Sequence, residues 1–171
     1  MSELEQVRLA PGQGRAEVYP VLFSQLTALL EGETDAVAGL ANCASLLYFG
    51  CGFWWVGFYR VLPCARGTEL VLGPFHGPVA CVRIAFGAGV CGSAWRERRP
   101  LNVPDVDAFP GHIACSSVTR SELVVPVFAA GDPAREVVAV LDLDSVVPAD
   151  FDSVDETWIV RVAALIGRTL F

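Results

Sequence analysis

Six cysteines are the residues of this 171-residue chain whose chemistry most needs an explanation. The N-terminus has no basic patch followed by an apolar stretch, so we expect a cytoplasmic protein, and thiols stay reduced in that compartment. A cytosolic disulfide is typically transient and catalytic rather than structural. The six thiols are therefore candidates either for redox chemistry or for packing as small buried hydrophobes: Cys43, Cys51, Cys64, Cys81, Cys91 and Cys115.

Three carboxylates, Glu122, Asp142 and Asp144, fall at the ends or edges of predicted strands. Asp142 and Asp144 are two positions apart, so they project to the same face of their strand. That strand is otherwise apolar, and two carboxylates on one face rarely serve packing. Like charges held together raise the pKa of at least one of them, which gives an acid usable near neutral pH, and the remaining negative charge suits an ammonium group. The alternative is that they are solvated turn residues.

Two aromatic residues and two loops add further candidate positions. Trp55 and Tyr59 lie four apart on a predicted strand and share a face, either as pocket walls or as ordinary core aromatics. The turn at Gly87 and Gly89 opens a predicted helix and can present backbone N–H groups to a carboxylate. His112 lies in a long loop, where it either orients its neighbours or only shapes the turn.

Zinc is another use for these side chains, with His112, Cys115 and two further thiols as ligands. The chain has no Cys-x-x-Cys pair, and the gaps between these residues are long. We therefore expect no metal site and no bound cofactor.

Hydrophobic periodicity predicts the elements that position these residues. Apolar residues recur at helical spacing up to Gly32 and again, after a cap at Thr34, up to Gly50. A short helix follows from Gly89 to Arg98. Alternating or continuous apolar runs predict strands over 53–62, 69–75, 80–86, 101–103, 122–129 and 136–143, of which 101–103 is a brief edge strand.

A long loop over 104–119 lacks any periodicity, and long ordered loops in compact domains are usually functional. An amphipathic helix over 152–169 ends the chain. This order of elements predicts an α+β fold with a mainly antiparallel sheet. We divide the chain into a polar lead-in, 1–16, and a single domain, 17–171.

Four segments together resemble one known family. They read WVGFY at 55–59, LGPFHGPVAC at 72–81, GAGVCG at 87–92, and PGHIAC at 110–115 followed by SE at 121–122 and LDLDS at 141–145. This set resembles the free methionine-(R)-sulfoxide reductases, stand-alone GAF domains that reduce the free amino-acid sulfoxide. The resemblance runs from about Tyr19 to the final helix. It implies a GAF-like domain whose N-terminal and C-terminal helices pack on one face of the sheet.

The resemblance also implies roles for three cysteines. Reduction of a sulfoxide needs a thiolate to attack the sulfur, an acid for the departing oxygen, and a second thiol to capture the sulfenic acid. Cys115 matches the family's nucleophile and Cys81 the cysteine that forms a disulfide with it, while Cys91 is an alternative resolving or reacting thiol. The other three are expected to pack as small buried hydrophobes: Cys43, Cys51 and Cys64.

The same resemblance implies the substrate contacts and the electron donor. Glu122, Asp142 and Asp144 would bind the substrate ammonium and polarise the sulfoxide, with Glu122 and Asp144 also catalytic. Trp55 and Tyr59 would wall the pocket around the substrate methyl group. The implied reductant is thioredoxin, supplied by NADPH and thioredoxin reductase.

Two alternatives involve no turnover: a GAF domain that binds a small ligand, and a GAF domain that senses thiol oxidation. Residues 151–156 resemble the tail of the cyclic-nucleotide GAF signature, but the Asn-Lys that opens that signature is absent because the chain contains no lysine. The net charge of −7 argues against nucleic acid and an anionic membrane as partners. The sequence leaves the oligomeric state open, with a homodimer as one option.

Overall fold

The computed structural model describes residues 7–10, 12–65, 67–113 and 116–171. Four α-helices and six β-strands follow one another along this part of the chain, with short 3₁₀ turns at Val106–Ala108 and Ala129–Gly131. Their bounds are α1 Arg15–Leu30, α2 Ala36–Cys51, β1 Trp55–Cys64, β2 Gly67–His76, β3 Arg83–Ile84, α3 Gly89–Glu97, β4 Leu101–Val103, β5 Ser121–Phe128, β6 Val137–Ser145 and α4 Ser153–Leu170. No helix among these residues is long and apolar enough to span a bilayer.

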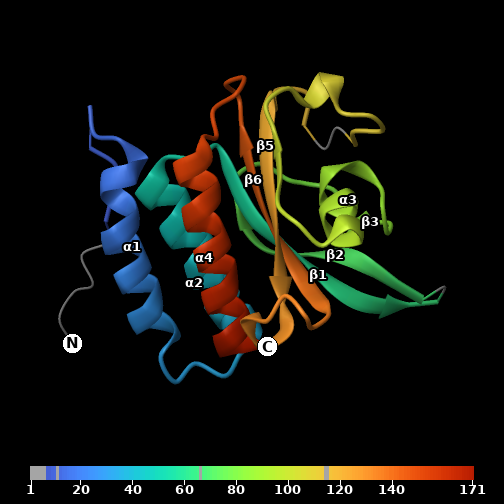
Figure 1. Cartoon of the computed structure of the whole chain (residues 1–171), viewed down its shortest axis with the longest axis horizontal. Helices are drawn as coiled ribbons and strands as arrows, with labels where there is room; N and C mark the ends of the chain where they lie inside the picture. The colour runs from blue at the N-terminus through green and yellow to red at the C-terminus, as the bar shows by residue number, and fades with distance from the viewer. Residues whose placement is uncertain (1–6, 11, 66, 114–115) are drawn as a thin grey trace.

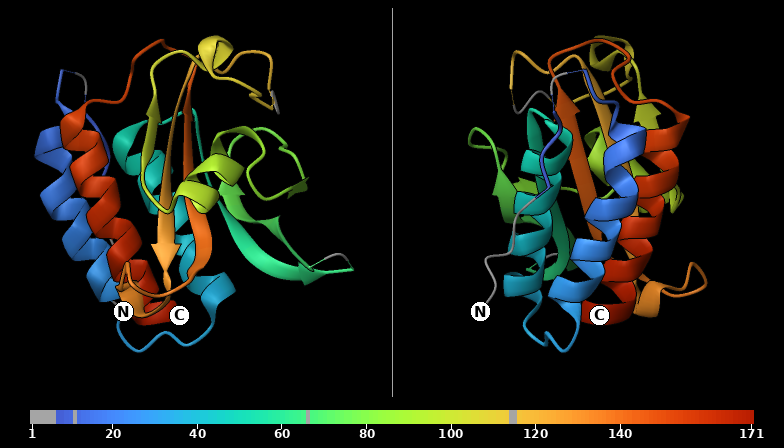
Figure 2. Two further views of the ribbon diagram at one scale, coloured as in Figure 1. Left: turned by 45° about the vertical axis from the view of Figure 1, so that its right-hand side comes forward. Right: turned by 90° about the vertical axis from the view of Figure 1, so that its left-hand side faces the viewer.

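The six strands form one antiparallel sheet in the order β3-β2-β1-β6-β5-β4. Helices α1, α2 and α4 cover one face, and α3 lies on the other face together with the loop that follows β4 (Figure 1). The two turned views show α1 and α4 running side by side along the sheet (Figure 2). The predicted α+β fold, its helices on one face and its edge strand at 101–103 are confirmed.

Alternation along β6 explains how one strand serves both faces. Leu141 and Leu143 are fully buried and join the core beneath the three long helices. Burial of a leucine side chain stabilises the fold by about 1.5–3 kcal/mol. Asp142 and Asp144 point the opposite way because side chains alternate between the two faces of a strand.

The register of the central strands brings distant residues onto that second face. Glu122 of β5 lies opposite Asp144 of β6, and Asp144 also lies opposite Trp55 of β1. Asp142 lies opposite Gly57. Directly opposed residues share a face, so strand pairing alone gathers these side chains.

Two predicted boundaries were wrong. The cap of α2 is Asp35 rather than Thr34, because the Asp35 carboxylate accepts a 2.8 Å hydrogen bond from the Ala38 N–H. The strand predicted over 80–86 is reduced to Arg83 and Ile84. Residues before it leave the ladder after the Gly77-Pro78 turn, although the Val82 carbonyl still accepts a 2.9 Å bond from the Leu72 N–H.

Candidate active site

Three acidic side chains on β5 and β6 lie on the face opposite the long helices. Glu122 and Asp142 are each only 6% exposed, and Asp144 is half-buried. Among the described residues, the one basic side chain within 4 Å of Glu122 is His112, at 3.7 Å from Nε2 to Oε2, and Asp142 has none. Burial lowers the pKa of the His112 imidazole, which disfavours its charged form. The Asp142 Oδ1 atom is buried without a hydrogen-bond partner in this part of the chain. The site therefore concentrates carboxylates without supplying the cations that usually accompany them.

Burial changes the protonation of all three acids. Loss of solvent raises the pKa of Asp142 to about 7, while nearby Cys91 and Glu122 oppose that rise by hydrogen bonding. Burial, and then the charge of Asp142, raise the pKa of both Glu122 and Asp144 well above the usual range. Burial therefore favours the protonated forms of these acids, as the like charges predicted from sequence suggest.

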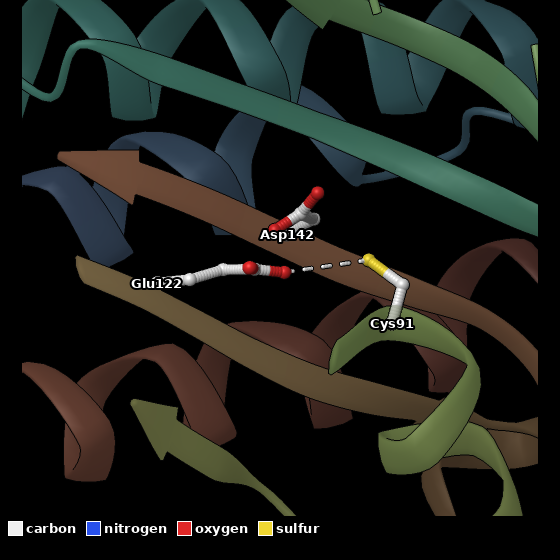
Figure 3. Close-up of side chains that lie close together, drawn as sticks. All are labelled: Cys91, Glu122 and Asp142. Atoms are coloured by element: carbon white, nitrogen blue, oxygen red, sulfur yellow. Dashed lines mark hydrogen bonds between the residues drawn. The ribbon is translucent and has the colours of Figure 1, made fainter. Parts of the chain in front are cut away.

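Cys91, in the first turn of α3, faces these carboxylates from above the sheet. Its Sγ lies 3.9 Å from Glu122 Oε1, and Asp142 completes the group (Figure 3). Burial raises the pKa of the Cys91 thiol well above its usual value, and the neighbouring Asp142 and Glu122 raise it further. Cys91 is thus a protonated thiol at neutral pH, which makes it a weak nucleophile.

An aromatic wall stands beside the acids. Trp55 stacks on Tyr59 with ring centroids 6.3 Å apart and on Phe75 at 5.5 Å. The Trp55 indole N–H donates a 2.9 Å hydrogen bond to the Pro78 carbonyl. The indole lies against Gly57 and Gly77, where any Cβ atom would clash with the ring. The prediction that Trp55 and Tyr59 share a face is confirmed.

A small pocket of about 30 Å³ opens between the wall and the acids. Its lining includes four predicted residues, Trp55, Tyr59, Asp142 and Asp144, together with His112. Sequence reasoning did not single out the remaining lining residues: Ala80, Ile84, Ile113, Ser116 and Thr119. A hydrogen bond from Thr119 partly offsets the raised pKa of Asp144. Their signal in the sequence was the long aperiodic loop, which supplies three of the five.

The remaining cysteines divide as follows. Cys43 and Cys51 are buried free thiols among the helices, as predicted. Cys64 is also free, but its predicted burial was wrong, because it lies half-exposed at the end of β1. Cys81 is half-buried and disulfide-bonded. Its predicted partner, Cys115, lies outside the described residues, so the predicted pairing stays a prediction.

The turn before α3 differs in detail from its predicted use. The Gly87 N–H donates a 3.0 Å bond to the Gly92 carbonyl, so it is not available to a ligand. The helix cap is Ala88, and Gly92 in turn donates a 2.9 Å bond to the Ala88 carbonyl. These bonds hold the first turn of α3, and with it Cys91, in place above the sheet.

Comparison with known proteins identifies the family to which this fold and sequence belong. The GAF domain family profile matches residues 25–170. The chain is 38% identical over 157 residues to the free methionine-R-sulfoxide reductase of Escherichia coli, which covers 91% of this chain and 90% of that protein. The chain belongs to this family of GAF domain proteins. It is also 43% identical over 164 residues to GAF domain-containing protein A of Dictyostelium discoideum, covering 96% and 99% of the two chains.

A solved structure of the same family extends the likeness to three dimensions. The free methionine-R-sulfoxide reductase of Neisseria meningitidis, solved in complex with its substrate, matches with a TM-score of 0.86 and 44% identity over 95% of this chain and 93% of that one. In the present GAF domain, the acids, Cys91 and both aromatic residues meet on one face of the sheet. The fold and family predicted from sequence are confirmed.

Proposed function

We propose that this protein is an oxidoreductase that reduces free L-methionine-(R)-sulfoxide to L-methionine. The observation that carries the proposal is the group of buried carboxylates with no strong cationic partner among the described residues, placed beside an aromatic wall. A free amino acid brings an ammonium group that compensates such a charge, whereas a residue inside a peptide does not. The named relatives in Escherichia coli and Neisseria meningitidis support the same substrate.

The chemistry proceeds in two thiol steps. The Cys115 thiolate attacks the sulfoxide sulfur, the oxygen takes a proton from Asp144, and transfer of that oxygen leaves methionine and a Cys115 sulfenic acid. The Cys81 thiol then attacks the sulfenic sulfur, which releases water and forms a disulfide. The raised pKa of Asp144 supports its role as the proton source, because it favours the protonated acid that such a step needs.

The state of Cys91 supports assigning the attack to another thiol. Burial and two carboxylates hold Cys91 in its protonated form, while the attacking species must be a thiolate. Its contact with Glu122 suits a residue that shapes the acid group rather than one that reacts first. Cys115 therefore remains our choice of nucleophile, with Cys81 as the resolving residue.

The surroundings of Cys81 support a protein as the reductant. Val79 is 88% exposed and Val82 is 63% exposed, so apolar side chains flank the half-buried cysteine. Arg83, the next residue, is paired with Glu69. This mainly apolar surface, whose adjacent arginine is already paired, favours a dithiol protein over a small anionic thiol. We propose cytoplasmic thioredoxin, which takes up the disulfide's oxidising equivalents and is reduced again by NADPH through thioredoxin reductase.

Substrate selectivity tests the activity. With thioredoxin, its reductase and NADPH, we expect NADPH consumption with the R epimer of free methionine sulfoxide and little with the S epimer. The N-acetylated, C-amidated R sulfoxide should react far more slowly, because it lacks the ammonium group. Equal rates on the free and blocked substrates would overturn the proposed role of the acids, and no turnover at all would favour a binding or sensing domain.

A single turnover without reductant tests the thiol sequence. We expect one equivalent of substrate to consume two thiols and leave Cys115 bonded to Cys81, as peptide mass mapping can show. Cys43, Cys51 and Cys64 should remain free. A Cys115 to Cys91 bond would instead make Cys91 the resolving residue.

A further inference from the structure

A second use of the buried cluster follows from its composition. The Sγ of Cys91 and one carboxylate oxygen each from Glu122 and Asp142 all lie within 4.8 Å of one another. They come from α3, β5 and β6, and all three residues are buried (Figure 3). A soft sulfur ligand beside two hard oxygen ligands is a set that zinc accepts.

An independent observation shows that one buried polar atom of the cluster lacks a partner within the described ranges. Asp142 is 6% exposed, yet its Oδ1 atom has no hydrogen-bond partner among the described residues. Buried polar atoms are normally hydrogen-bonded, and each exception calls for a cause. In the same part of the chain no lysine or arginine pairs with Asp142 or Glu122. A cation beside Asp142 would supply the positive charge that the described residues do not.

We propose that Cys91, Glu122 and Asp142 form a binding site for a thiophilic divalent cation, with Zn²⁺ as the best fit. Zinc bonds of about 2.3 Å to sulfur and about 2.0–2.2 Å to oxygen place tetrahedral ligand atoms roughly 3.5 Å apart. The 3.9 Å from Cys91 Sγ to Glu122 Oε1 is close to that spacing, so small side-chain rotations complete the geometry. Three protein ligands leave a fourth position for water.

His112 has a supporting place in this site. Its Nε2 atom lies 3.7 Å from Glu122 Oε2, while Cys91 contacts the other oxygen, Oε1. The two oxygens of Glu122 therefore have different neighbours: Oε1 faces the proposed metal position and Oε2 faces the imidazole. When the imidazole closes on Oε2 as the metal binds, the hydrogen bond that forms would raise metal affinity by about 10–100-fold. His112 is thus a positioning residue for the cation.

A bound cation would inhibit the reductase. It would neutralise Glu122 and Asp142, which the substrate ammonium needs, so metal and substrate should compete. This competition rests on the proposed function, whereas metal binding does not. The sequence did not indicate the site because its ligands are separated by 31 and 20 positions and carry no ligand-spacing motif.

Cobalt(II) is the probe for the site, because a thiolate bound to cobalt gives a charge-transfer absorption band. The full chain carries Cys81→Ser and Cys115→Ser, which removes the other redox thiols, and is kept reduced with a phosphine. We expect one equivalent of Co²⁺ to produce the band and Zn²⁺ to abolish it. Adding Cys91→Ser should remove the band, whereas adding Cys43→Ser, a matched buried thiol elsewhere, should leave it.

Carboxylate variants separate a built site from a reactive thiol alone. Asp142→Asn should weaken Co²⁺ binding ~10-fold or more, and His112→Ala about 10-fold, with thermal melting confirming that each variant folds. Absence of the band in the parent protein, or its persistence after Cys91→Ser, would overturn the site. Equal affinity in Asp142→Asn would overturn the assigned ligand set.

Competition by substrate tests the inhibition separately. Because the parent variant lacks Cys115, free methionine-(R)-sulfoxide should displace cobalt without being consumed. Cobalt that binds through Cys91 but is not displaced by the sulfoxide leaves the metal site intact and contradicts the shared use of the acids. Displacement by the sulfoxide supports both proposals.

Discussion

Two buried aspartates, one on each side of the sheet, show what distinguishes a structural acid from one available to a ligand. Asp155, at 3% exposure among the long helices, accepts a 2.6 Å hydrogen bond from the Tyr19 hydroxyl and a 3.0 Å bond from the Asp152 N–H. Its other contact is Arg15, at 3.4 Å. Asp142, at 6% exposure, has an oxygen with no partner in the described chain. Both aspartates are therefore buried, but in this part of the chain only Asp155 has a hydrogen-bond partner for each of its carboxylate oxygens.

The difference has an energetic meaning. A buried charge that is paired and hydrogen-bonded is tolerated by the fold, while an unpaired one shifts its pKa and takes up a proton. On the face covered by the long helices, other protein groups hydrogen-bond and pair with Asp155. On the opposite face, the Oδ1 atom of Asp142 lacks such a partner among the residues described, and its burial costs stability until a ligand binds.

The largest expected effect is on the reaction itself. Asp144→Asn keeps the size of the side chain but removes the transferable proton, so the first reduction step should slow by ~10²-fold or more. Single-turnover kinetics with excess free R sulfoxide measures this step. Thermal unfolding should hardly change, and wild-type single-turnover rates would show that Asp144 is not the proton source.

The matched variant Glu122→Gln separates binding from chemistry. If Glu122 mainly holds the ammonium, the change should weaken substrate binding more than it slows the bound-state reaction. The opposite pattern would exchange the roles of Glu122 and Asp144.

The next effect is on the helix side and concerns stability alone. Replacing Cys43, Cys51 and Cys64 together by alanine should lower the free energy of unfolding by on the order of 2 kcal/mol, mostly from the two buried positions. Denaturant unfolding measures the loss, and activity per folded molecule should be unchanged. A loss of activity in the folded triple variant would contradict the division between the two sides.

The last effect depends on pH. Because the folded pKa of Asp142 is raised to about 7, its favourable contribution is complete below the unfolded value near 4 and is lost as the pH rises through about 7. Relative to wild type, Asp142→Asn should therefore gain stability as the pH rises from about 4 to about 7, by on the order of 1 kcal/mol for each pH unit. Melting temperatures across that range measure the difference. A constant offset would mean that Asp142 is not protonated by burial.

The sequence predicted the acid group well because strand periodicity is a local signal. The spacing of Asp142 and Asp144 placed both on one face, and strand pairing then brought Glu122 opposite Asp144. The family resemblance predicted the aromatic wall and the fold. These inferences need only the pattern of one strand or one motif.

The contributions of loops and of long-range tertiary contacts to the site could not be predicted in this way. Thr119 and Ile113 reach the pocket from an aperiodic loop whose path no pattern describes. The contact between Cys91 and Glu122 joins a helix to a strand 31 positions away. The raised pKa of Cys91 follows from its burial between the helix and the sheet and from the neighbouring carboxylates. The local sequence around Cys91 does not indicate these neighbours.

Gly57 has a consequence for the size of the ligand that the pocket can hold. Gly57 does not line the pocket, yet its missing side chain lets the indole of Trp55 rest directly on β1. That same indole is part of the aromatic wall that lines the pocket. Any larger residue at position 57 would clash with that ring, which lines a pocket of only about 30 Å³. The capacity of the site thus depends on a residue that is not itself part of the pocket lining.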